Sequence, residues 1–280
     1  MDLNDNSIKN NNWCIGYSAS EKILELNKKW KALILNEEDY INNKLKNICS
    51  SKVVTNSETL KVISEILEYD DIYLKKVGID HNEFRIAQDS LKLSKFKEKL
   101  EKAIELIIDV FPWMRTILNQ VIDNIIPIEI VNGTGKAGFS SVEAKGLIFL
   151  SINKIDEQSV FEVAIDLFHE IGHTILFTYQ FADEIIEKES RNLLVYSSIK
   201  KSKRPVIMTF HALYALTYMK YFLKALLQIE NIEVDKNRFF LKDEFSKISS
   251  MHLETYKEIL EHNIKFTTLG KILFLECIHN

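Results

Sequence analysis

Two histidines and a glutamate stand at metal-binding spacing in the segment His169-Glu170-Ile171-Gly172-His173. This is an HExxH motif, and it lies in a stretch, 160–177, whose apolar pattern predicts one continuous helix. Residues four apart on a helix lie one turn above each other on one face, so both imidazoles can reach one ion while Glu170 leans toward the same side. Surface histidines beside a salt-bridging glutamate are the structural alternative, but the stretch is more apolar than a solvated helix needs. The motif therefore predicts metal chemistry.

A catalytic metal site of this kind needs a third protein ligand, with positions left open for water or substrate. The metzincin continuation HExxHxxGxxH is excluded, because Leu176 and Tyr179 stand at its Gly and His positions. A zinc peptidase of the gluzincin type would take a glutamate from a following helix, and its Glu170 would be the general base that activates water. Three glutamates are available for that ligand: Glu184, Glu187 and Glu189. The other candidate is His211, in an otherwise apolar segment where a lone histidine is more often a core residue than a ligand.

The order of elements around the motif resembles a family of HExxH-type peptide β-hydroxylases, which depend on α-ketoglutarate and modify ribosomally synthesised peptides. The resemblance covers roughly residues 127–219. A proline that usually follows the Tyr-Ser pair is absent, since Ile199 comes after Ser198. The elements that carry the resemblance are, in order, Phe139-Ser140-Ser141, Gly146-Leu147-Ile148-Phe149-Leu150-Ser151, the HExxH motif, Tyr196-Ser197-Ser198, Arg204-Pro205 and His211-Ala212.

The resemblance implies Fe(II) held by His169, His173 and His211, with α-ketoglutarate as cosubstrate and a precursor peptide as substrate. The usual non-haem iron site has two histidines and one carboxylate, so one of the three glutamates is the alternative third ligand. Arg204 is expected to bind the distal carboxylate of α-ketoglutarate, because bidentate recognition favours arginine and the chain has only five. In such an oxygenase Glu170 would orient a ligand or the substrate.

Three hypotheses about function follow from these residues. The first is an iron hydroxylase that adds oxygen to the β-carbon of a peptide side chain. The second is a zinc peptidase of the gluzincin type, and the third is a non-catalytic interaction protein whose histidines are structural. Stoichiometric metal binding separates the first two hypotheses from the third.

Helices dominate the expected fold, because apolar residues recur at helical spacing and only three prolines and eight glycines interrupt the chain. Ser159 and Glu162 form a capping box at the start of the HExxH helix. Two strands, with a glycine-rich loop between them that lacks the Lys-Ser/Thr of a P-loop, are expected to form a hairpin beside the metal site. The expected helices are 18–46, 57–68, 90–110, 113–124, 160–177, 206–227 and others beyond 230, and the expected strands are 128–131 and 147–152.

A single domain of the α+β class, predominantly α-helical, is expected, since neither a repeat nor a flexible linker is visible. Its expected parts are a disordered start (1–12), a helical N-terminal layer (13–125), a metal-site core (126–230) and C-terminal helices (231–280). The alternating charges of residues 95–102 are typical of a solvated helix face.

The amino-acid composition indicates which classes of binding partner and which cellular location to expect. The chain is 46% hydrophobic, and its 36 basic and 40 acidic residues are well mixed, which argues against a nucleic-acid or membrane partner. Three distant cysteines without a CxxC pair predict no disulfide framework and fit a reducing cytoplasm. The polar start carries no export signal, and no apolar run is long enough for a transmembrane helix. We expect a cytoplasmic protein whose partner is a peptide, while its oligomeric state stays open.

Overall fold

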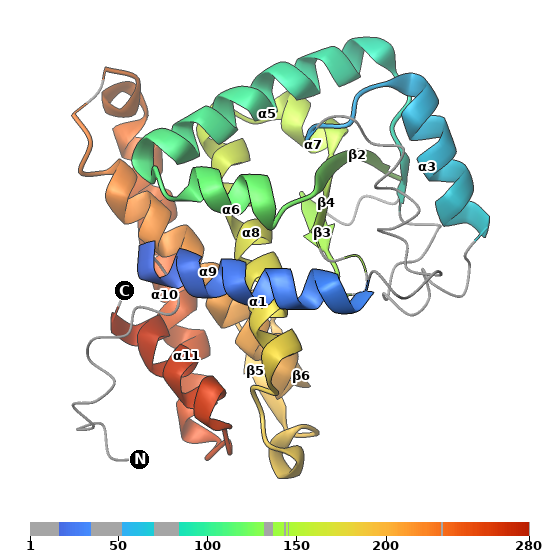
Figure 1. The fold of residues 1–280 in the computed structure, drawn as a ribbon. Helices are drawn as coiled ribbons and strands as arrows, with labels where there is room; N and C mark the ends of the chain where they lie inside the picture. The colour runs from blue at the N-terminus through green and yellow to red at the C-terminus, as the bar shows by residue number, and fades with distance from the viewer. Residues whose placement is uncertain are drawn as a thin grey trace. The chain divides into compact units, whose positions relative to one another are not determined.

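A computed structural model of the chain describes residues 17–34, 52–69, 84–131, 137–142, 144, 146–230 and 232–279. The predicted segment 1–12 lies outside them. The described residues are mainly helical, with one four-stranded sheet and one two-stranded sheet (Figure 1), so the predicted class, predominantly helical α+β, is confirmed. Contacts between residues divide the chain into two compact units, one of residues 31–177 and one of 1–30 with 178–280. The boundary falls inside the HExxH helix.

The sheet of the first unit has the strand order β1-β2-β4-β3. Its strands are β1 (Phe84–Ile86), β2 (Asn124–Ile130), β3 (Gly138–Ser140) and β4 (Leu147–Ser151). The predicted hairpin between 128–131 and 147–152 is wrong in its pairing, because β2 and β4 run parallel. A hairpin does precede the HExxH helix, but β3 and β4 form it. The reason lies in burial: β4 is buried on both faces, which suits a strand between two others.

The helices of this unit are α3 (Ser57–Tyr69), α5 (Ser90–Val110), α6 (Met114–Gln120), α7 (Ile152–Glu157) and the first part of α8 (Val160–Ala182). The predicted helices 57–68 and 90–110 are confirmed, and the Asp89 side chain caps α5 by accepting from the amides of Leu91 and Lys92. Helix α6 is shorter than the predicted 113–124, because Asn124 already belongs to β2.

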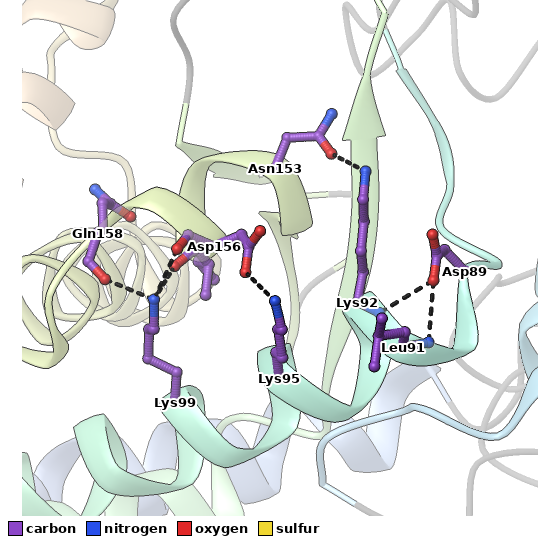
Figure 2. A network of polar contacts seen from close by, with 9 residues as sticks. Asp89, Leu91, Lys92, Lys95, Lys99, Asn153, Asp156 and Gln158 are labelled. Atoms are coloured by element: carbon purple, nitrogen blue, oxygen red, sulfur yellow. Dashed lines mark hydrogen bonds and ion pairs between the residues drawn. The ribbon is translucent and has the colours of Figure 1, made fainter.

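A polar network joins α5 to α7 and to Gln158, the residue that caps the end of α7 (Figure 2). Lys99 Nζ donates to the backbone carbonyls of Ile155, Asp156 and Gln158 at 2.7, 3.0 and 2.7 Å. These carbonyls lie at the C-terminal end of α7, where a helix leaves its acceptors unpaired. Lys95 approaches the Asp156 carboxylate at 3.7 Å. The prediction of a solvated face for 95–102 is therefore wrong for Lys99, while other members of the run form the expected exposed pairs within α5.

The second unit contains most of α1 (Tyr17–Ile34) and the end of α8, followed by η1 (Lys188–Ser190), β5 (Leu194–Ser197) and β6 (Ser202–Pro205). Three helices complete it: α9 (Val206–Leu226), α10 (Ile232–Glu261) and α11 (Thr268–His279). Helix α9 confirms the predicted 206–227, and α9 packs against both α10 and β5. The predicted helix 18–46 is described only as far as residue 34. No described helix combines the length and the apolar character that crossing a membrane requires.

Candidate metal centre

The start of the HExxH helix is fixed by reciprocal capping. The Ser159 amide donates to Glu162 Oε2 at 2.8 Å, and the Glu162 amide donates to Ser159 Oγ at 3.3 Å. The predicted capping box is thus confirmed, and α8 begins at Val160 as expected. The helix continues to Ala182, beyond the predicted end at 177, so the motif lies well inside it. A regular helix is a rigid support for side chains that must converge on one point.

His169 and His173 converge at their ring tips. Their Nε2 atoms lie 3.0 Å apart, and the two rings meet edge to face with centroids 4.6 Å apart. Two nitrogen ligands of one ion lie about 3.0 Å apart at a right angle and about 3.4 Å apart at the tetrahedral angle, for metal–nitrogen bonds of about 2.1 Å. The observed distance fits two ligands of one metal ion, although it also fits a hydrogen bond between the rings. Both rings are half-buried, as ligands open to a substrate would be.

Glu170 points to the sheet and is held there. Its Oε2 accepts a hydrogen bond of 2.8 Å from Ser140 Oγ, which comes from β3, and the residue is only 6% exposed. The Thr174 hydroxyl also bonds to the Glu170 backbone carbonyl. Because the loss of a hydrogen bond to a buried acceptor is costly, Ser140 fixes one oxygen of this side chain. The serine segment quoted from the sequence and the glutamate of the motif therefore meet in the structure.

His211 has a different neighbour. It lies in α9, and its Nε2 is 2.8 Å from Oε1 of Gln180, which is near the end of α8. Since an amide oxygen only accepts, Nε2 carries the proton and the lone pair lies on Nδ1. The residue keeps some accessible surface, yet burial of the ring lowers the pKa of His211 to about 4, so the ring is neutral at pH 7. His211 and Gln180 belong to one unit and the HExxH pair to the other, so His211 as third ligand stays a prediction.

The three candidate glutamates do not lie on an α-helix. Glu184 forms an ion pair with Arg191 and is exposed, and the other two lie at or within η1. The next α-helix along the chain, α9, carries no Asp or Glu. Among the described residues no three His, Cys, Asp or Glu side chains form a group that could hold a metal. The structure thus brings two of the predicted ligands together and leaves the third undecided.

Arg204 lies on the inner face of the β5–β6 hairpin. It pairs across the hairpin with Val195, which is fully buried, and residues paired across two strands share a face. Arg204 is itself half-buried. In the described part of the chain no carboxylate pairs with its guanidinium. A partly buried arginine that has no carboxylate partner within that part of the chain is well suited to bind an anionic ligand.

Sequence reasoning missed Gln180 as the partner of His211. Its only local signal is its position on α8, seven residues after His173 and therefore two turns further along the same helix.

Comparison with protein-family models finds no match, and comparison with curated proteins finds no significant similarity.

Proposed function

We propose that this chain is an iron- and α-ketoglutarate-dependent hydroxylase that adds one oxygen atom to a side-chain β-carbon of a ribosomally synthesised peptide in the cytoplasm. The observation that carries the proposal is the His169–His173 pair, whose Nε2 atoms lie 3.0 Å apart inside α8. These two imidazoles would hold Fe(II), and His211 would be the third ligand. Imidazole suits both Fe(II) and zinc, so the choice of metal rests on the other residues.

Bound Fe(II) would activate oxygen, which then oxidises α-ketoglutarate and turns a C–H bond of the peptide into C–O–H. One oxygen atom enters the peptide and the other enters succinate, as carbon dioxide leaves. Arg204 would bind the distal carboxylate of the cosubstrate, a role supported by its half-buried position and by the lack of a carboxylate partner among the described residues.

The environment of Glu170 favours the hydroxylase over a zinc peptidase. A peptidase needs this carboxylate as a base that takes a proton from water. Here Glu170 is buried and one of its oxygens accepts a hydrogen bond from Ser140, which suits a residue that orients its neighbours. Helix α9, the α-helix that directly follows α8 in the chain, also carries no acidic residue that could serve as a gluzincin ligand. The zinc peptidase is nevertheless the second candidate, because Glu170 stands between the two histidines, where a peptidase base would stand.

Substrate turnover tests the proposal. The protein, reconstituted without oxygen with Fe(II) or with zinc, is mixed with short peptides encoded beside its gene, α-ketoglutarate and ¹⁸O₂. We expect succinate and a peptide heavier by one labelled oxygen, with Fe(II) only. Glu170→Gln should still turn over α-ketoglutarate, as should the control Glu157→Gln at an exposed position. Cleaved peptide from the zinc-loaded protein, without need of α-ketoglutarate, would overturn the hydroxylase.

A further inference from the structure

Two residues of β5 turn their backbone groups away from the partner strand of the β5–β6 hairpin. The Val206 amide donates to the Leu193 carbonyl at 2.9 Å, which makes residues 193 and 206 a hydrogen-bonded pair just outside the strands. Because hydrogen-bonded and non-bonded pairs alternate along antiparallel strands, the pairs Leu194–Pro205 and Tyr196–Lys203 are non-bonded. The backbone groups of these residues point away from the partner strand. Among the described residues, no backbone hydrogen bond from outside the hairpin reaches Leu194 or Tyr196.

Only one of the two edges can accept another strand with a full set of hydrogen bonds. On β6, Pro205 has no N–H and Lys203 adds a charge, and both are features that protect an edge from pairing. On β5, Leu194 and Tyr196 each present an N–H and a C=O. Leu194 is 54% exposed, so this edge is accessible at its start. We define the outward backbone of Leu194 and Tyr196 as the β5 edge.

The side chains beside this edge select what can bind. Leu194 and Pro205 share the outer face of the hairpin and are both exposed, while Tyr196 and Lys203 share that face nearer the turn. The turn adds the exposed Lys200 and Lys201. The chain carries no Asp or Glu between Ser190 and Glu230, although its net charge is −4. The hairpin is thus apolar at its base and basic toward its turn.

From these observations we infer that the β5 edge binds an extended acidic peptide segment, which adds to the hairpin as a third strand. In a strand, residues i and i+2 point to the same face, so the segment would place an apolar residue level with Leu194 and an acidic residue two positions away, level with Tyr196 and Lys203. A nucleic acid would satisfy the lysines but not the backbone edge. This inference rests on the proposed function in one respect, since the peptide is taken to be the precursor substrate.

The test uses the complete protein with a chelator and without α-ketoglutarate, so its outcome does not depend on the metal reaction. The probe is a fluorescein-labelled peptide that repeats Val-Thr-Glu-Thr, which places Val and Glu two positions apart on one face, and its binding is followed by fluorescence anisotropy. The comparison peptide has the same sequence with N-methyl groups on alternate residues. These methyl groups replace the N–H donors along one edge of the peptide and keep another strand from approaching that edge. Losing two backbone hydrogen bonds should weaken binding roughly tenfold.

Lys203→Glu should also weaken binding roughly tenfold or more, because it replaces attraction by repulsion beside the acidic residue. The control is Lys224→Glu, the same charge change at an exposed position of α9 in the same acid-free segment, and its affinity should stay within about twofold of wild type. Thermal unfolding checks that both variants are folded. The inference is overturned if the N-methylated peptide binds as well as the unmodified one, or if Lys203→Glu binds like wild type. Tighter binding of single-stranded DNA or of phosphatidylserine vesicles, lost in Lys203→Glu, would also overturn it in favour of another class of partner.

Discussion

The hydrogen bond from Ser140 to Glu170 should make a measurable contribution to stability. A hydrogen bond to a charged group contributes about 1.5–3 kcal/mol, and the acceptor here is 6% exposed. We therefore expect Ser140→Ala to lower the free energy of unfolding by about 2 kcal/mol, because the buried carboxylate loses a donor. Ser140→Thr keeps the hydroxyl on a strand position that favours threonine, so its cost should be below about 0.5 kcal/mol.

A double-mutant cycle with Glu170→Gln isolates this bond from other effects of the substitutions. The neutral amide leaves a weaker bond of about 1 kcal/mol, so Ser140→Ala should cost less in the Gln background, with a coupling energy of about 1 kcal/mol. Urea unfolding in the presence of a chelator, followed by circular dichroism, measures each free energy. Ser94→Ala at an exposed position of α5 is the control and should change stability by less than about 0.5 kcal/mol. Equal costs of Ser140→Ala in both backgrounds, or no cost in either, would refute the reasoning.

Three further perturbations test other parts of the structure. Burial lowers the pKa of His252 to about 4 from its usual 6.5, so His252 binds more protons in the unfolded chain between these values and should by itself lower the free energy of unfolding by about 3 kcal/mol as pH falls from 6.5 to 4. His252→Gln should reduce this dependence of the free energy of unfolding on pH, measured by urea titrations at several pH values. An unchanged dependence would contradict the role given to His252. Lys99→Ala should cost about 2 kcal/mol in the same assay, because three carbonyls at the end of α7 lose their donor. Lys97→Ala, which breaks only an exposed pair, should cost less than about 0.5 kcal/mol, and equal costs would refute the role of Lys99. Arg204→Ala should raise the α-ketoglutarate concentration needed for half-maximal turnover roughly tenfold or more while iron affinity stays within about twofold, and a parallel loss of both would argue against carboxylate binding.

Features set by residues close in sequence could be predicted. The capping box of Ser159 and Glu162 joins residues three apart, and the resulting helix begins where the sequence predicts. The convergence of His169 and His173 follows in the same way from helical spacing. Segments such as α5 and α9 carry apolar residues at helical spacing over many turns, so their existence and most of their bounds follow from the pattern.

Features set by residues far apart in the sequence could not be predicted. Strand β3 separates β2 and β4 along the chain and takes the place beside β4, which no local pattern indicates. Strands β5 and β6 are four residues long, too short for alternation to stand out from the polar segment around them. The bonds of Lys99 to the end of α7 and of Gln180 to His211 join separate helices. A lysine in a charge run and a glutamine in a helix give no sequence signal for such partners.

The central claim is that His169 and His173 hold Fe(II) together with α-ketoglutarate. The most direct measurement is an anaerobic titration of the metal-free protein with Fe(II) in the presence of α-ketoglutarate, followed by the visible charge-transfer absorption of the chelated keto acid. We expect the absorption to saturate at one Fe(II) per chain and to disappear in His169→Ala and in His173→Ala, because each variant lacks a ligand. A titration without a saturable absorption, or one that is the same in both variants as in wild type, would contradict the claim.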